Sequence, residues 1–186
     1  MHSNLWVEEK FQDFLGIKFK VEKVLFSGKS DFQTVDVVET KGHGKMLLND
    51  GLIMVTERDE FAYHDMISHV PLFVHPTPKN VLVIGGGDGG TAREVIRHAS
   101  VDKCTMVEID GMVVEACKAH IPQTACALDD KRINLIIGDG VQFVKETKEK
   151  FDVIIVDSTD PIGPAQPLFG EEFYQDVFNC LNDDGI

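Results

Sequence analysis

The second half of the sequence alternates strand-like and helix-like segments, and no other feature constrains the fold as strongly. Apolar runs typical of strands buried on both faces recur between residues 80 and 157, with helix-like segments between them. This alternation predicts a doubly wound parallel sheet with helices on both faces, a Rossmann-like α/β fold. The predicted strands are NVLVIG, CTMVEID, INLIIGD and FDVIIVDST, and the predicted helices are TAREVIRHA, GMVVEACKAHI, VQFVKETKEK and EEFYQDVFNCL.

The first part of the chain has a different rhythm. Apolar and polar residues alternate in IKFKVEKVLFSG and FQTVDVVET, and the tight turns KGHGK and NDG follow. This pattern predicts a small antiparallel β domain over residues 1–56 and a catalytic domain over residues 57–186. We expect a helix to start at Thr56, because Asp59 follows three residues later as in a capping box. The chain ends at NDDGI, where a further strand would be expected, so the predicted sheet is C-terminally incomplete.

The charge balance limits the class of ligand. The chain has 18 basic and 31 acidic residues, a formal net charge of −13, which disfavours nucleic acid and suits a cationic ligand. Its apolar runs are too short to span a membrane, and we find no signal-peptide pattern at the start. The four cysteines lack CxxC spacing, so we expect reduced thiols, no zinc site and a cytoplasmic location.

The loop GGGDGG, which follows the first parallel strand, matches the dinucleotide pattern G-x-G-x-x-G at Gly85, Gly87 and Gly90. Glu108 lies 18 residues further on, where a ribose-binding acid is expected. Asp88 inside the loop opposes a pyrophosphate and favours a cation without phosphate. An adenosyl sulfonium compound has that chemistry, whereas a solvent-facing Asp88 is the plain alternative.

Every predicted parallel strand ends in a carboxylate, and such ends meet at one edge of the sheet. The fourth strand delivers Asp157 and Asp160 to the Pro/Gly-rich segment DSTDPIGPAQPLF. Two further acids suit an amine co-substrate, with one holding an ammonium and the other accepting a proton. Alternatively, they only cap a turn. Tyr63 and His64 lie on the preceding helix, where a core or solvent-facing role is the ordinary expectation.

Taken together, these motifs resemble the spermidine synthase family of aminopropyltransferases. The segments that carry the resemblance are TERDEFAYHDMISHVPL, VLVIGGGDGG, REV, VEID, GDG and DSTDPIGPAQPLF. It implies a class I methyltransferase-like frame and a homodimer or larger homo-oligomer. It also implies aminopropyl transfer from decarboxylated S-adenosylmethionine to putrescine, which yields spermidine and methylthioadenosine. The donor would be a co-substrate, and neither a metal nor a separate cofactor is implied.

The resemblance also implies roles for individual residues. Asp157 would be the proton acceptor, Tyr63 would help to orient the amine, and Asp160 would hold the far end of putrescine. Asp88 would meet the aminopropyl ammonium, and Glu108 would take the ribose hydroxyls. The donor would be held by Gln33, His64, Asp88, Glu108, Asp139, Gly140 and Pro164, with Asp139 and Gly140 on the adenine side and Pro164 beside methylthioadenosine.

Three other functions stay open at this point. One is a related transferase, either a putrescine N-methyltransferase or an aminopropyltransferase for another polyamine. Another is a non-catalytic module that binds methylthioadenosine or polyamines, which the expected incompleteness of the sheet motivates. The third is an NAD oxidoreductase, which the acid in the glycine loop disfavours.

Overall fold

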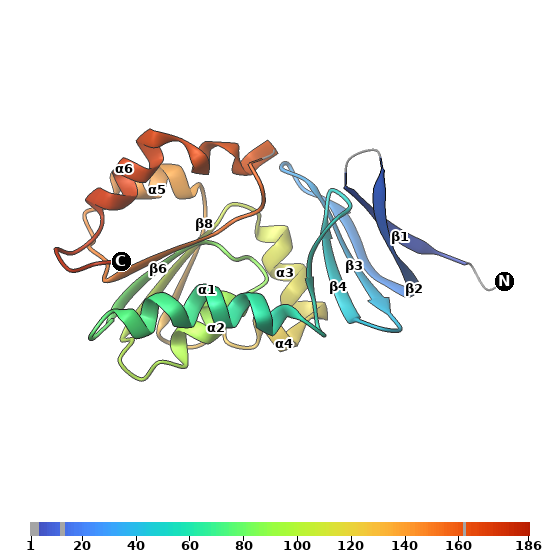
Figure 1. Ribbon diagram of the computed structural model, residues 1–186, viewed down its shortest axis with the longest axis horizontal. Coiled ribbons are helices and arrows are strands. Elements are labelled where there is room, and N and C mark those ends of the chain that lie inside the picture. Colours follow the sequence, from blue (N-terminus) through green and yellow to red (C-terminus); the bar gives the residue numbers. More distant parts are fainter. Residues whose placement is uncertain (1–3, 12–13, 162) are drawn as a thin grey trace.

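The chain forms two β-sheets, with the helices gathered around one of them (Figure 1). The computed structural model describes residues 4–11, 14–161 and 163–186, and the side chains of Phe11 and Pro164 lie outside this description. Among the described residues, none of the helices combines the length and the hydrophobicity that a membrane span requires.

The N-terminal sheet is antiparallel, and its strands follow one another in chain order. The strands are β1 (Trp6–Phe11), β2 (Leu15–Lys29), β3 (Thr34–Thr40), β4 (Gly44–Asn49) and β5 (Leu52–Thr56). The predicted strands in residues 17–56 are therefore present. Strand β1 was not predicted, because three consecutive charged residues in WVEEKF hide the alternation.

The second sheet is parallel and has the strand order β8-β7-β6-β9. Its strands are β6 (Asn80–Gly85), β7 (Lys103–Glu108), β8 (Ile133–Ile137) and β9 (Val153–Asp157). The first strand along the chain therefore lies between the second and the fourth, as in doubly wound folds. The predicted Rossmann-like fold class is confirmed.

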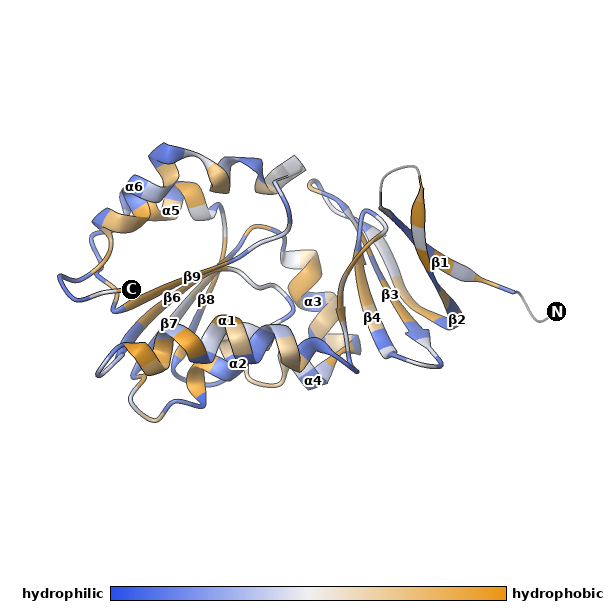
Figure 2. Cartoon of the chain, viewed as in Figure 1, coloured by the Kyte–Doolittle hydropathy of each residue, from blue (hydrophilic) through white to orange (hydrophobic). Residues whose placement is uncertain are grey.

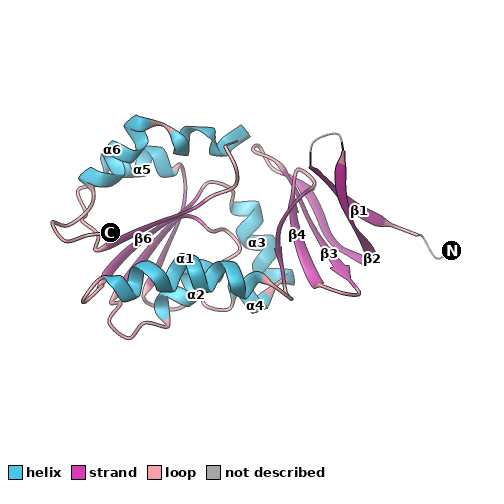
Figure 3. Ribbon diagram, in the orientation of Figure 1, coloured by secondary structure: helices cyan, strands magenta, loops and turns pink. Residues whose placement is uncertain are grey.

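Helices cover both faces of this parallel sheet (Figure 3). Val81 and Val83 of β6 pack toward one helical layer, and Leu82 and Ile84 pack toward the other, as the alternation of a strand requires. The first layer holds α1 (Glu60–Val74), α2 (Gly90–Ile96), α3 (Gly111–His120) and α4 (Pro122–Ala125). The second holds α5 (Gly140–Glu146), α6 (Glu171–Asn179) and the 3₁₀ helix η1 (Gly163–Phe169). Hydrophobic residues run along the strands between these layers (Figure 2).

The N-terminal sheet packs one face against α3. Val35, Val37, Leu47 and Val55 belong to the same buried cluster as the first helical layer of the parallel sheet. The opposite face has a small cluster of its own, around Met46. The division at residues 56 and 57 into two domains stays a prediction, because a shared core does not tell whether each part folds alone.

The predicted start of the first helix was wrong. Thr56 ends β5, where it is buried, and its hydroxyl donates a hydrogen bond to Asp59 Oδ1 at 2.5 Å. Helix α1 begins four residues later, at Glu60, with Asp59 as its N-cap residue. Thr56 therefore belongs to the sheet and not to the helix. The local sequence pattern does not distinguish these two possibilities. The short helix α4 was also not predicted.

Candidate active site

The carboxyl ends of β6 and β9 form the point where the strand order of the sheet reverses, which is where α/β sheets bind ligands. The glycine loop after β6 passes directly against β9. Gly86 N donates a hydrogen bond to the Asp157 carbonyl at 2.9 Å, and Gly85 has a φ of +85°. A Cβ at Gly85 would lie 2.0 Å from that carbonyl, so the close approach requires glycine.

Asp157 lies at the end of β9, and two hydroxyl groups hold its carboxylate. Tyr63 Oη, from α1, donates to Oδ1 at 2.7 Å, and Thr91 Oγ1, from α2, donates to Oδ2 at 2.7 Å. Burial and the charge of Asp88 raise the pKa of Asp157, while the two hydrogen bonds and the charge of His64 oppose that rise. Burial and Asp157 in turn raise the pKa of Tyr63, so the phenol remains a donor.

Asp88 lies in the glycine loop and faces a buried histidine. Its Oδ1 accepts a hydrogen bond from Gly90 N at 2.8 Å and lies 3.3 Å from His64 Nε2. Burial alone would lower the pKa of His64, but the hydrogen bonds to Asp88 and Glu60 and the charge of Asp88 raise it to about 9. The ring packs so closely on the loop that a Cβ at Gly90 would lie 2.2 Å from its Cε1.

A buried ion pair lies behind His64 and was not predicted. Glu60 Oε2 lies 2.5 Å from His64 Nδ1, and Arg93 Nη1 and Nη2 donate to the two oxygens of Glu60 at 3.0 and 2.9 Å. Burial would raise the pKa of Glu60, but hydrogen bonds from Arg93, Gln123 and His64 lower it to about 2. The i, i+4 spacing of Glu60 and His64 in the sequence is the one signal that could have suggested the contact.

Donor atoms of His64, Asp88 and Asp157 lie within 4.8 Å of one another, close enough to hold a metal ion. The ring nitrogens of His64, however, face Glu60 and Asp88. Two carboxylates on opposite sides of the ring favour its protonated form, which offers no lone pair to a metal. The donor set therefore suits a cationic organic group better than a metal.

A second group of polar residues lies at the carboxyl end of β7. Glu108 is buried, its Oε1 accepts a hydrogen bond from Asp110 N at 2.8 Å, and burial raises its pKa to about 7. Asp110 caps α3 through Met112 N, and its other oxygen accepts from Gln33 Nε2 at 3.0 Å and Ser30 Oγ at 2.7 Å. Gln33 thus reaches the strand ends from the turn between β2 and β3, through contacts that spacing did not predict.

The other predicted site residues are less fully placed. Asp139 caps α5 by accepting from Val141 N at 2.8 Å, and Gly140 is the buried first residue of that helix. Asp160 is exposed in the loop after β9, and no side-chain hydrogen bond of its carboxylate is observed among the described residues. Pro164 falls in η1, but its side chain lies outside the described part of the chain.

The structure therefore brings together most of the predicted residues, in two neighbouring groups. Direct contacts join Tyr63 to Asp157 and His64 to Asp88. Glu108 lies against the same glycine loop, since a Cβ at Gly87 would lie 2.9 Å from its Oε2. Several residues that contact this site were not predicted from the sequence. They are Ser30, Glu60, Thr91, Arg93 and Gln123.

Two domains of a known protein family match consecutive parts of the chain. Residues 60–186 match the spermine/spermidine synthase domain, and residues 5–57 match the spermidine synthase tetramerisation domain. The chain belongs to the spermine/spermidine synthase family. The resemblance inferred from the sequence motifs is thereby confirmed.

Relatives with known names agree with this assignment. The chain is 51% identical to a polyamine aminopropyltransferase of Methanocaldococcus jannaschii, over 98% of this chain and 62% of that protein. It is 52% identical to one of Caldicellulosiruptor saccharolyticus, over 98% of this chain and 66% of the relative. The chain thus spans less than two thirds of the length of these relatives.

Solved structures show the same fold. A spermidine synthase in complex with the transition state analogue AdoDATO matches with a TM-score of 0.96 and 47% identity, over 98% of this chain and 63% of that one. The spermidine synthase from Thermotoga maritima matches with a TM-score of 0.93 and 47% identity, over 98% and 62%.

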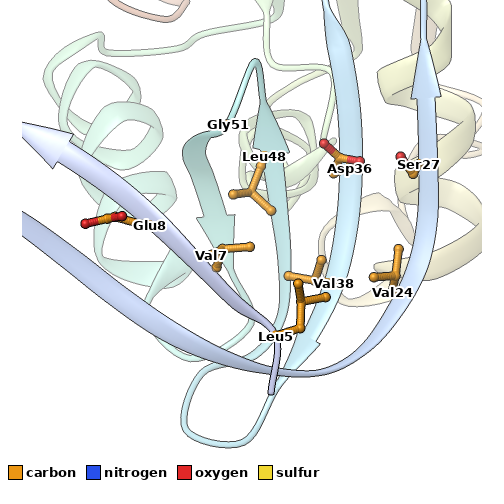
Figure 4. Close-up of a pocket in the computed structure, with 9 residues that line it drawn as sticks. All are labelled: Leu5, Val7, Glu8, Val24, Ser27, Asp36, Val38, Leu48 and Gly51. Atoms are coloured by element: carbon orange, nitrogen blue, oxygen red, sulfur yellow. The ribbon is translucent and has the colours of Figure 1, made fainter. Parts of the chain in front are cut away.

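A separate pocket of about 260 Å³ opens on the N-terminal sheet (Figure 4). It shares no residue with the strand-end site, and it includes Val38 and Leu48 from the face of the sheet opposite to α3. Its lining is Leu5, Val7, Glu8, Val24, Ser27, Asp36, Val38, Leu48 and Gly51. The mainly aliphatic lining does not resemble the charged site at the strand ends.

Proposed function

We propose that this chain carries the donor site and the proton acceptor of an aminopropyltransferase. The donor is decarboxylated S-adenosylmethionine, the acceptor is putrescine, and the products are spermidine and methylthioadenosine. The observation that carries the proposal is the position of Asp157, held by two hydroxyl groups beside Asp88 and His64 where the strand order reverses. The names of the relatives support the same reaction.

The reaction requires alignment and removal of one proton. Asp157 accepts a proton from the putrescine ammonium beside it, and its raised pKa makes it a better acceptor than an exposed aspartate. The lone pair that this frees on nitrogen attacks the aminopropyl carbon bound to sulfur, the electrons of the breaking C–S bond neutralise the sulfonium, and the new secondary amine leaves as an ammonium. Because the sulfonium is already a good leaving group, positioning and deprotonation are the main tasks of the protein.

The two groups of residues divide the substrates between them. The Asp88 carboxylate, paired with His64, faces the aminopropyl ammonium, whereas the buried carboxylate of Glu108 accepts hydrogen bonds from the ribose hydroxyls. Tyr63 orients the amine beside Asp157, and Asp160 meets the distal ammonium of putrescine. The remaining proposed donor contacts are Gln33, Asp139, Gly140 and Pro164.

Product analysis tests this proposal directly. The protein is incubated with putrescine or spermidine as acceptor, and with either decarboxylated S-adenosylmethionine or S-adenosylmethionine as donor. We expect spermidine and methylthioadenosine from the first donor only. Methylputrescine from the second donor would instead identify an N-methyltransferase, and transfer to spermidine in place of putrescine would identify another polyamine as acceptor.

Calorimetry with methylthioadenosine keeps the test informative in the absence of turnover. Binding without transfer would assign this chain a binding role alone. No binding of methylthioadenosine and no transfer would contradict the proposed donor site.

We further propose that the pocketed face of the N-terminal sheet mediates self-association. Leu5 and Val24 line the pocket and are 43% and 46% exposed, and an exposed aliphatic surface favours burial against another copy. The tetramerisation domain matched by residues 5–57 supports this role. Light scattering should give a mass above that of the monomer, and Val24→Asp should lower it.

A further inference from the structure

The ion pair between Glu60 and Arg93 is a buried charged feature that the proposed reaction does not use. Both side chains are largely inaccessible, with 2% exposure for Glu60 and 16% for Arg93. The guanidinium donates to both carboxylate oxygens, and Gln123 Nε2 adds a hydrogen bond to Oε1 at 3.0 Å. This bidentate arrangement fixes the Glu60 carboxylate in one orientation.

That fixed carboxylate faces one nitrogen of His64, and Asp88 faces the other. Nδ1 lies 2.5 Å from Glu60 Oε2, and Nε2 lies 3.3 Å from Asp88 Oδ1. A neutral imidazole can donate through one nitrogen only, whereas an imidazolium donates through both. Two carboxylates on opposite sides of the ring therefore select the protonated form.

The charged and titratable groups near His64 lie on four parts of the fold. They are Glu60 and the neutral Tyr63 phenol on α1, Asp88 in the glycine loop, Arg93 on α2 and Asp157 at the end of β9. Arg93 contacts His64 only through Glu60, so the carboxylate partly shields its charge from the ring. The positive ring lies beside Asp88 and Asp157, two carboxylates that would otherwise repel each other.

On the side of Glu60 away from His64, the contacts lead to a guanidinium. Beyond Glu60 the contacts continue through Arg93 to Glu94, whose Oε1 accepts from Arg93 Nε at 2.7 Å. A guanidinium does not give up its proton in a protein, so no proton passes along this chain of contacts. The ion pair is therefore a fixed set of charges and not a proton path.

We propose that Glu60, anchored by Arg93, is a positioning residue that holds His64 as an imidazolium, and that this imidazolium orients Asp88 and keeps Asp157 ionised as a proton acceptor. The first part concerns the charge of His64 and stands on geometry alone. The second part rests on the proposed aminopropyl transfer.

The Glu60→Gln variant tests the role, because it keeps an oxygen near Nδ1 and removes the negative charge. Histidine signals in NMR spectra recorded against pH report the state of His64, with His64→Gln used for assignment. In the unchanged protein we expect His64 to stay protonated at pH 7 and to titrate at a pH of about 9. In Glu60→Gln we expect its midpoint to fall by about one pH unit or more.

Glu94→Gln is the matched control. It removes a carboxylate from the other side of Arg93 and leaves the contacts of Glu60 and His64 in place. We expect it to move the His64 midpoint by much less than Glu60→Gln does. If Glu60→Gln does not fold, the double variant Glu60→Gln/Arg93→Gln removes both charges together and is titrated in its place.

Two results would overturn the proposal. One is a His64 that is neutral at pH 7 in the unchanged protein, and the other is an unaltered midpoint after loss of the Glu60 charge. In the transfer assay we expect Glu60→Gln to move the basic limb of the pH–rate profile to lower pH, together with the His64 midpoint, because the imidazolium is then lost at lower pH. A uniform loss of rate at all pH values would show a merely structural role.

The two proposals can fail separately. A shifted His64 midpoint without any transfer activity would leave the positioning role intact and contradict the proposed function. Transfer activity with an unshifted midpoint would do the reverse.

Discussion

The two groups of carboxylates at the strand ends use similar residues in different surroundings. Asp157 accepts hydrogen bonds from two hydroxyl groups, Asp88 faces the buried His64, and donor atoms of the three residues lie within 4.8 Å of one another. Glu108 accepts a backbone N–H, contacts no cationic side chain among the described residues, and has a pKa raised to about 7 by burial. All three carboxylates lie at strand ends, so position alone does not distinguish them. The groups around each carboxylate decide whether it suits proton transfer or the binding of hydroxyl groups.

The largest expected effect comes from Asp157→Asn. The amide keeps the shape of the side chain but cannot accept a proton from the attacking nitrogen, so turnover should fall by about 10²- to 10⁴-fold. Binding of methylthioadenosine, measured by calorimetry, should change little, because that ligand lacks the aminopropyl group. Near-normal turnover would contradict the role of Asp157 as proton acceptor. It would also contradict the functional difference between the two groups of carboxylates.

Glu108→Gln should weaken the binding of methylthioadenosine, which Asp157→Asn should leave nearly unchanged. Loss of a charged hydrogen-bond acceptor costs about 1.5–3 kcal/mol, which corresponds to roughly 10- to 150-fold weaker binding of methylthioadenosine. The His64 titration should be retained, because Glu108 does not contact that ring. Unchanged methylthioadenosine binding would place the ribose elsewhere.

The pH dependence of binding sharpens the same comparison. The pKa of Glu108 is raised to about 7, so its carboxylate is ionised above that pH and protonated below it. If the ionised form binds the ribose, the affinity for methylthioadenosine should be constant above pH 8 and fall by up to about tenfold per unit below pH 6. Glu108→Gln is the control and should remove this dependence, whereas a pH-dependent Glu108→Gln would point to another group.

The smallest effect is expected from Tyr63→Phe. It removes the 2.7 Å hydrogen bond to Asp157 Oδ1 and leaves Thr91 on the other oxygen. A hydrogen bond to a charged group contributes about 1.5–3 kcal/mol. Tyr63 is half-exposed, so water can replace part of this contribution, and turnover should fall by about tenfold. A loss as large as that of Asp157→Asn, with the rate measured under the same conditions, would show that the phenol does more than orient the carboxylate.

Much of the site followed from one rule about parallel sheets. The apolar runs were recognisable as strands, and their ends placed Asp88, Glu108 and Asp157 at one edge. The contact of Gln33 with Asp110 depends on how the N-terminal sheet packs on α3, which no local pattern encodes. Such contacts join residues 77 positions apart in the sequence.

The Glu60–Arg93 pair shows the same limit within the helical layer. Its members belong to different helices, separated by 33 residues, and each alone is an ordinary charge on a helix. A helix that started at Thr56 would also have placed Glu60 in its second turn, whereas Glu60 is the first residue of α1. Only the packing of α1 against α2 makes these two residues partners.

The tight fit of the glycine loop has a consequence for mutational tolerance. A methyl group at Gly85 would strike the backbone of Asp157, and one at Gly90 would strike the ring of His64. A saturation scan of this loop would therefore record losses that have no connection with direct ligand contact. Alanine at Gly85 or Gly90 would displace the neighbouring site residue, Asp157 or His64. Its effect on activity should therefore resemble that of substituting the site residue itself.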